Sequence, residues 1–333
     1  MADSAGARPE TASDYDALRA GAIVLDRGDR ARWRFTGAKA AETLTGLVTN
    51  DVLALQPGEG LYAAALTPKG KIVADLRVLR DGDEYLVDTG PAAAAGWRAM
   101  VRKFVNPRVT PFSEITGQTC DLGLFGKRAA ELLSRLFEGA GCSFDQLRPY
   151  AHIRARFQGA DVSIVRASEL GEIPGFDIIA PAEAAAALTA RLVAAGAMPG
   201  TRKTFDVARI EAGFPEWGAD MTDDTLAQEA NLDELGAISY SKGCYVGQEV
   251  VARIHFRGHV NRTLRRITFA GDRVPRRGAE LVDASGKTVG DVRSATASPR
   301  SGGVGIAMAR REVGAGDSLT AQWADGRAEV VVI

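Results

Sequence analysis

The stretch Ser241-Lys-Gly-Cys-Tyr-Val-Gly-Gln-Glu-Val-Val-Ala-Arg253 carries the most information about this chain. Two glycines bracket Cys244 and favour a tight, exposed turn. The residues from Gln248 onward are typical of the first turns of a helix, so Cys244 would lie just before a helix N-terminus. A helix start and the ammonium of Lys242 both favour the thiolate over the thiol. Cys244 is therefore a candidate reactive thiol that Lys242 activates; the alternative is a small buried hydrophobic residue.

Composition excludes several classes of protein. The 333 residues include 41 Lys and Arg against 42 Asp and Glu, which gives a net charge of −1 and no overall basic field for nucleic acid. No apolar run approaches the roughly 20 residues that span a bilayer. We therefore expect no membrane partner and no direct nucleic-acid partner.

The cysteines and histidines predict neither disulfides nor a resident metal site. Cys120, Cys142 and Cys244 lie far apart, and an odd number without close spacing fits a reducing compartment. With only three histidines, a self-contained zinc or iron–sulfur ligand set is not expected. Residues 1–16 lack the pattern of a signal or transit peptide. We expect a short disordered arm there and a cytoplasmic protein.

Turn residues mark a run of hairpins. Residues 22–26 and 31–35 read as strands and 37–50 as a helix. Further on, Pro68-Lys-Gly70 and Asp81-Gly-Asp83 separate three strand patterns, and an Ala-rich helix follows from residue 91 to about 105. From residue 262 short β-like runs alternate with Gly and Asp turns, which indicates a small barrel or sandwich. The fold class is α+β followed by a C-terminal β domain.

The motif Lys242-Gly-Cys-Tyr-Val-Gly-Gln-Glu249 resembles the signature of the YgfZ family. That family is a branch of the folate-binding aminomethyltransferase fold of the glycine-cleavage T-protein. In aminomethyltransferases the position of Cys244 is usually acidic, so this residue separates the two branches. Four further segments resemble the same family in order along the chain: 44–52, 66–75, 171–177 and 209–213.

The resemblance implies a three-domain aminomethyltransferase-like fold around a central hole that holds tetrahydrofolate or a derivative. Its parts would be the disordered arm 1–16, a discontinuous α+β domain of 17–50 plus 118–258, a hairpin–helix α+β domain of 51–117, and a C-terminal β-barrel domain of 259–333.

The resemblance also implies polar residues near folate. Asp177 aligns with a folate-contacting glutamate, and a carboxylate suits the adjacent N–H donors of a pterin edge; the alternative is a strand end that faces water. Asp75 remains from an acidic pair that includes a catalytic residue in aminomethyltransferases, and here it is either catalytic or structural. Asn50 and Asp51 either contact the ligand or form a helix cap or turn.

Four further residues complete the cofactor-binding candidates. Arg209 either faces folate or forms an ion pair within its domain, and Trp217 either lines the cavity or lies in the core. Arg253 and Arg257 belong to a local basic run that is either a solvated face or a contact for folate's glutamate tail, a nucleic acid or an acidic protein. The family's folate-binding arginine is replaced here by Phe205, which departs from the pattern.

Three functions follow as hypotheses. The resemblance implies a folate-binding accessory factor for assembly or maintenance of [4Fe–4S] proteins, with an indirect effect on tRNA modification. Its partners would be iron–sulfur carrier or client proteins, with Cys244 as a possible transient cluster contact, because one cysteine cannot hold a cluster alone. The alternatives are a tetrahydrofolate-dependent aminomethyltransferase or demethylase that uses Asp75, and a non-catalytic scaffold.

Overall fold

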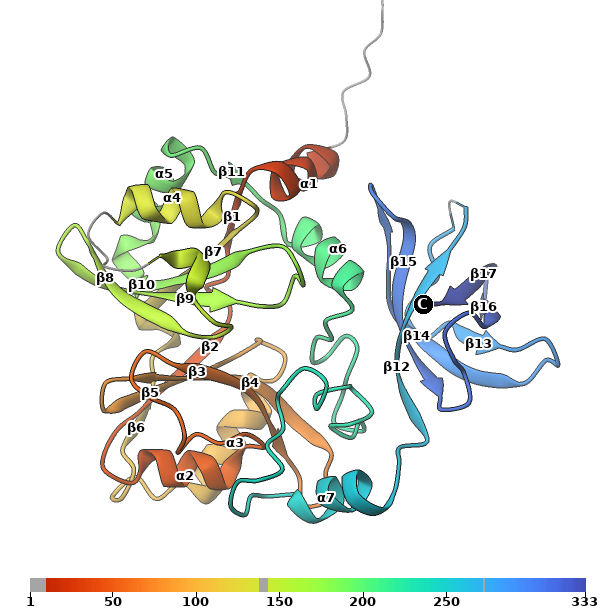
Figure 1. Cartoon of the computed structure of the whole chain (residues 1–333), viewed down its shortest axis with the longest axis horizontal. Helices are drawn as coiled ribbons and strands as arrows, with labels where there is room; N and C mark the ends of the chain where they lie inside the picture. The colour runs from red at the N-terminus through yellow and green to blue at the C-terminus, as the bar shows by residue number, and fades with distance from the viewer. Residues whose placement is uncertain (1–9, 138–142, 272) are drawn as a thin grey trace, which may run out of the picture.

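Two stacked sheets and a barrel make up the molecule, as Figure 1 shows. The computed structural model describes residues 10–137, 143–271 and 273–333. In this part of the chain no helix is long and apolar enough to cross a membrane. Cys142 and residues 1–9 lie outside the described residues.

The first sheet has the strand order β11-β1-β7-β10-β9-β8. Its strands are β1 (Ile23–Asp26), β7 (Thr119–Phe125), β8 (His152–Phe157), β9 (Ala160–Ala167), β10 (Gly175–Pro181) and β11 (Met198–Pro199). Helices α4 (Ala129–Leu136) and α5 (Ala185–Ala194) cover its outer face (Figure 1). Leu133 and Leu188 from these helices join Leu122 and Phe176 in one fully buried apolar cluster. Burial of these side chains, each worth roughly 1.5–3 kcal/mol, holds the helices on the sheet.

The second sheet has the order β3-β4-β5-β2-β6. Its strands are β2 (Ala31–Phe35), β3 (Gly60–Leu66), β4 (Ile72–Asp81), β5 (Glu84–Thr89) and β6 (Phe112–Glu114), and helices α2 (Ala40–Leu47) and α3 (Ala94–Phe104) cover its outer face (Figure 1). The expected hairpins are therefore confirmed. Gly70 (φ 74°) and Gly82 (φ 64°) supply the left-handed turns between their strands.

Strand β4 explains why charge collects between the two sheets. Side chains alternate between the faces of a strand. Ala74, Leu76 and Val78 therefore pack into the core under α2 and α3. Asp75 and Arg77 lie on the opposite face, toward the other sheet.

The C-terminal segment forms a closed barrel in the order β12-β15-β14-β13-β16-β17. Its strands are β12 (Arg262–Phe269), β13 (Glu280–Val282), β14 (Thr288–Ser298), β15 (Gly302–Arg310), β16 (Ser318–Trp323) and β17 (Gly326–Val332). The strand pattern left barrel and sandwich open, whereas the family resemblance predicted a barrel, and the structure confirms the barrel. Helix α6 (Arg202–Ala212) and the chain that follows it run between the barrel and the sheets, and α7 (Gln248–Arg257) leads into the barrel (Figure 1).

Three expectations differ from the structure. Residues 10–16 are helical rather than disordered, because α1 (Glu10–Ala20) buries Tyr15 and Leu18 against the body of the protein. The helix expected over 37–50 is confined to α2. Strand β2 pairs with β5 and β6, and α2 packs on the same sheet, so residues 31–35 and 40–47 lie with the second sheet and not with residues 118–258. The other domain limits stay a prediction.

Candidate functional site

A cavity of about 530 Å³, counted with its open mouth, lies between the sheets and the segment after α6. We call it the central cavity. Its walls combine aromatic, cationic and acidic side chains: Tyr62, Tyr150, Phe205, Phe214 and Trp217; Arg27, Arg30, Arg77, Arg202 and Arg209; Asp75, Glu169 and Glu216. Three of the residues expected from the sequence, Asp75, Arg209 and Trp217, are brought together here.

The aromatic wall suits a flat ring. Tyr62 stacks on Tyr150 with ring centroids 5.9 Å apart, and Phe214 lies 5.5 Å from Tyr62. The indole N–H of Trp217 is buried and has no hydrogen-bond partner among the described residues. An unpaired buried donor costs about 1–3 kcal/mol. The wall therefore offers apolar faces together with a donor that a ligand could satisfy.

Asp75 is the carboxylate of this cavity that stands beside the aromatic wall. The hydroxyl of Tyr62 donates to its Oδ2 at 3.0 Å. Burial raises the pKa of Asp75, although the charge of Arg30 and the Tyr62 hydrogen bond oppose this. A buried carboxyl group of this kind can accept hydrogen bonds from N–H donors, and its raised pKa makes it easier to protonate than an exposed aspartate.

Beneath the cavity lies a buried network of four guanidinium groups and four carboxylates. Its members are Arg27, Arg30, Arg32, Arg77, Asp88, Asp121, Glu169 and Asp177. The equal numbers keep this part of the protein close to neutral when all eight groups are charged. Buried ions of this kind need partners, because the desolvation of an unpaired ion costs several kcal/mol.

Asp177 belongs to this network and does not line the cavity. Its side chain is fully buried, Arg27 Nη1 donates to its Oδ1 at 3.0 Å, and Arg77 Nη1 donates to its Oδ2. Both oxygens are bound to arginines in this conformation, so the direct contact with folate that the sequence predicts is not formed by a free carboxylate and stays a prediction. Asp177 instead positions Arg27 and Arg77, which reach the cavity wall.

Two carboxyl groups of the network have pKa values that are shifted in opposite directions. Burial opposes the ionisation of Glu169, but the charges of Arg27 and Arg77 lower its pKa to about 2. Burial and the neighbouring charge of Asp177 raise the pKa of Asp121 to about 7, against the attraction of the arginines. The network therefore includes one carboxylate that stays charged and one that can take up a proton near neutral pH.

Arg209 fastens the turn after α6. Its Nη1 donates to the carbonyl of Phe214 at 2.8 Å and to Asp220 at 2.5 Å. The ion pair is thus within the domain, and the same guanidinium also borders the central cavity. Gly213 ends the helix at φ 73°, a conformation that favours glycine.

Arg202 also lines the cavity, although it was not among the residues expected from the sequence. It lies one helical turn before Phe205, which packs edge-on against Phe125 with ring centroids 5.2 Å apart. The side chain of Arg202 is 48% exposed and pairs with Asp206 at 3.1 Å and Glu216 at 2.5 Å. Residues three, four and seven apart share a helix face. Because Arg202 lies three residues before Phe205 and seven before Arg209, this spacing was a signal that could have identified Arg202 as a cavity residue.

The side chains of Asn50 and Asp51 form hydrogen bonds with the backbone of the protein and do not face the cavity. Nδ2 of Asn50 donates to the carbonyls of Tyr62 (2.9 Å) and Gly236 (2.8 Å). Oδ1 of Asp51 accepts from the amide of Leu53 at 3.1 Å, which closes a turn. Neither residue lines the central cavity. The capping alternative is therefore the one that the geometry supports.

The loop before α7 exposes Cys244, as expected for a reactive thiol. Lys242 is buried, and its Nζ donates to the carbonyl oxygens of Val48 (2.6 Å) and Thr45 at the end of α2. Burial lowers the pKa of Lys242 to about 8, against the opposing charges of Asp51 and Cys244. Lys242 thus anchors the loop to the negative end of α2. Cys244 itself is not among the residues that line the central cavity.

Arg253 and Arg257 lie on α7 and are exposed. Neither lines the central cavity, so a contact of these arginines with folate's glutamate tail stays a prediction that would need the tail to extend beyond the cavity. The helix turns both side chains to solvent, because Val251 is the helix residue buried in the core.

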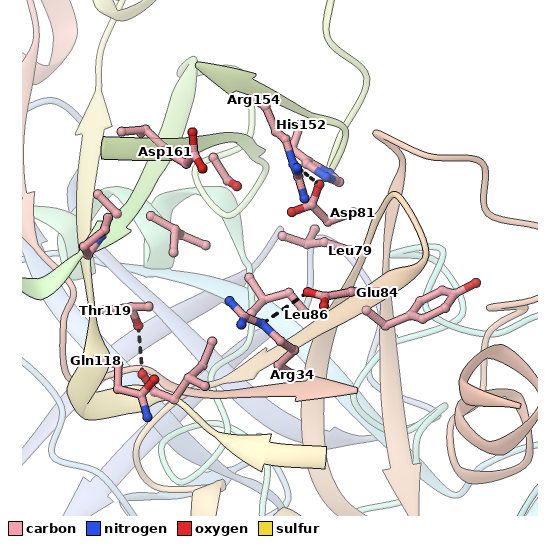
Figure 2. A pocket seen from close by; sticks show the side chains of 17 residues that line it. Arg34, Leu79, Asp81, Glu84, Leu86, Gln118, Thr119, His152, Arg154 and Asp161 are labelled. Atoms are coloured by element: carbon pink, nitrogen blue, oxygen red, sulfur yellow. Dashed lines mark hydrogen bonds and ion pairs between the residues drawn. The ribbon is translucent and has the colours of Figure 1, made fainter. Parts of the chain in front are cut away.

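A second cleft of about 1050 Å³, counted with open solvent, lies where β8–β10 meet β4 and β5 (Figure 2). Ion pairs join Arg34 to Glu84 and Arg154 to Asp81 across its rim. His152 lies in its wall, with both ring nitrogens buried and unpaired among the described residues. None of the residues expected from the sequence to act in the site lines this cleft. Among residues 10–137, 143–271 and 273–333 no group of three His, Cys, Asp or Glu could hold a metal ion.

Comparison with known proteins places this geometry in a family. The model for the GCVT N-terminal domain matches residues 4–239, and that for the CAF17 C-terminal beta-barrel domain matches residues 262–333. The structure of the glycine cleavage system aminomethyltransferase T from Bartonella henselae superposes with a TM-score of 0.85 at 22% identity, over 97% of this chain and 88% of that chain. The two proteins share the aminomethyltransferase fold.

Curated relatives carry two names. The aminomethyltransferase of Nostoc sp. (strain PCC 7120) is 26% identical over 295 residues, which are 87% of this chain and 77% of the relative. The tRNA-modifying protein YgfZ of Escherichia coli O17:K52:H18 is 32% identical over 273 residues, which are 78% of this chain and 75% of the relative. With this identity over most of its length, and with both domain models matched, the chain belongs to the YgfZ family within the GCVT fold.

Proposed function

We propose that this protein is a cytoplasmic, folate-binding accessory factor for the assembly or maintenance of [4Fe–4S] proteins, with an indirect effect on tRNA modification. The observation that carries the proposal is the exposed Cys244, which stands in the family motif where aminomethyltransferases usually have an acidic residue. A thiol can exchange with a cluster or a client thiol; one cysteine cannot hold a cluster alone, so a carrier or client protein supplies the other ligands.

The residues of the central cavity fit tetrahydrofolate. Tyr62, Tyr150 and Trp217 offer faces for the pterin ring, and the unpaired indole N–H of Trp217 is a donor for a ring acceptor. Asp75 would accept from the N–H groups of the pterin edge. Arg202, half exposed at the wall, would meet the anionic glutamate tail in place of the arginine that Phe205 replaces. When bound, the folate would supply one-carbon chemistry at its nitrogens.

Calorimetry with purified protein and tetrahydrofolate tests the cavity. We expect saturable heat for the wild type and at least about tenfold weaker binding for Asp75→Asn, because a charged acceptor is lost. The matched control is Asp161→Asn in the second cleft, which should bind as the wild type does. No heat for the wild type would favour the scaffold hypothesis, and loss in both variants would move the site away from the central cavity.

Cys244→Ala tests the thiol. In cells that lack the native protein, the variant should leave a [4Fe–4S] enzyme at low activity, whereas Ser241→Ala in the same exposed loop should restore it. Full activity with Cys244→Ala contradicts a role of the thiol.

The aminomethyltransferase hypothesis keeps one supporting observation, the buried Asp75 with its raised pKa beside the aromatic wall. It predicts that purified protein with tetrahydrofolate turns over a methylamine donor and that Asp75→Asn abolishes this turnover. Wild-type protein that binds tetrahydrofolate without turnover would exclude it.

A further inference from the structure

One face of α7 is unusual for a surface helix. Arg253, Phe256 and Arg257 are three and four residues apart and therefore lie on the same side of the helix. Phe256 is 68% exposed and is the most exposed large hydrophobic residue in the described part of the chain. We call these three side chains the α7 patch. A large aromatic side chain left in water between two guanidinium groups has the composition of protein-binding hot spots.

The aromatic side chain is held in place from behind. Tyr240 stacks on His255 with ring centroids 3.6 Å apart, and His255 meets the edge of Phe256 at 4.6 Å and 82°. Such contacts restrict the ring and reduce the entropy that a partner must remove on binding. The patch therefore presents a pre-organised apolar anchor.

The guanidinium groups of the patch are free to meet a partner. Within the described residues no carboxylate lies at ion-pair distance from Arg253 or Arg257, whereas the arginines that line the central cavity all have such partners. Glu249, one turn earlier, is the acidic residue of the helix, so the two arginines leave an excess of positive charge on this face. Neither arginine lines the central cavity, so they are not placed to bind the tail of a ligand there.

We propose that the α7 patch is the docking surface for an acidic segment of a partner protein. Phe256 fills an apolar pocket of the partner, and Arg253 and Arg257 pair with its carboxylates. Tyr240, four residues before Cys244, stacks on His255 of α7, so a partner docked on the patch is brought beside the loop that carries the exposed thiol. The net charge of −1 for the whole chain favours a protein over a nucleic acid as the occupant.

The proposal that the partner is an iron–sulfur carrier or client protein rests on the proposed function. The proposal that the α7 patch is a docking surface does not depend on it.

Photo-crosslinking in cells with Phe256→p-benzoylphenylalanine identifies the contact. The matched control is Phe104→p-benzoylphenylalanine, because Phe104 at the end of α3 is 46% exposed. We expect a protein crosslinked from position 256 and not from 104, with the contact in an acidic segment. No protein crosslink, the same crosslinks from both positions, or crosslinked RNA overturns the proposal.

Affinity measurements with the purified partner test the chemistry. Arg253→Glu with Arg257→Glu should weaken binding at least about tenfold, as for loss of close interfacial charge pairs. Arg253→Lys with Arg257→Lys should retain most of the affinity, and changing the partner's carboxylates to lysine should restore binding to the glutamate variant. Phe256→Ala should also weaken binding. Unchanged affinity in the glutamate variant overturns the proposal.

The two proposals fail in different ways. If the crosslinked acidic partner neither carries nor receives a cluster, the proposed function fails and the docking surface stands. If a [4Fe–4S] enzyme needs Cys244 but is unaffected by the glutamate variant and by Phe256→Ala, the docking surface fails and the proposed function stands.

Discussion

Asp177→Asn is a substitution outside the cavity wall that the structure predicts to be strongly destabilising. The change keeps the shape of the side chain and removes one charge from the buried network. Asp177 is fully buried, with Arg27 on one carboxylate oxygen at 3.0 Å and Arg77 on the other. Its loss leaves four guanidinium groups against three carboxylates.

The expected cost is about 3–5 kcal/mol of the free energy of unfolding, which is typical when one partner of a buried pair is removed. Ionisation of Asp121 in the variant offsets part of this loss of stability. The charge of Asp177 helps burial to raise the pKa of Asp121 to about 7, so removing Asp177 lowers that pKa and lets Asp121 ionise. The lower part of the range is therefore expected, with a fall in melting temperature of at least roughly 5 °C.

Asp121→Asn is the matched control. The native pKa of Asp121 lies above its unfolded value of about 4, so between these two pH values the native state binds more protons than the unfolded state does. The contribution of Asp121 to stability thus decreases as pH rises from about 4 to 7. At about pH 6 the wild-type carboxyl is largely protonated, and Asp121→Asn should cost only about 1 kcal/mol.

Urea unfolding at pH values from 4 to 8 measures both variants. We expect Asp177→Asn to be the less stable variant at pH 6, and Asp121→Asn to remove the loss of stability toward neutral pH. If Asp177→Asn melts within about 1 °C of the wild type, or if Asp121→Asn is the more damaging change at pH 6, the description of the network is wrong.

Two further predictions concern contacts at other positions. The pKa of Glu169 is lowered to about 2, so its ion pairs stabilise the native state fully at pH values above the unfolded pKa of about 4.3, and this stabilisation is lost as the pH falls toward 2. Glu169→Gln should therefore make the free energy of unfolding depend less on pH between about 4 and 2. An unchanged pH dependence in that range contradicts this prediction. The hydroxyl of Tyr15 donates to both oxygens of Glu211 at 2.7 and 2.9 Å and ties α1 to α6; Tyr15→Phe should lower stability by about 1.5–3 kcal/mol in thermal unfolding, whereas an unchanged melting temperature would show that this link contributes nothing.

The sequence by itself determined the features that depend on short segments. The hairpins form where Gly70 and Gly82 permit left-handed turns, and the period-two pattern of their strands sets which side chains are buried. The C-terminal strands and the motif around Cys244 are equally local, and they led to the barrel, the family and an exposed thiol. Asp75, Arg209 and Trp217 came from the same reasoning and lie together in the central cavity.

Tertiary structure alone decided what each charged side chain meets. Arg27 and Asp177 are 150 residues apart in sequence, and they meet because β1 and β10 flank β7 in the first sheet. Arg77 and Asp177 are 100 residues apart, and they meet because the second sheet stacks on the first. Packing of the loop before α7 against α2 likewise brings Lys242 to the end of that helix, which is nearly 200 residues earlier. Local patterns report turns and burial, whereas the partner of a buried ion depends on which distant strand packs opposite, because only there is its desolvation compensated.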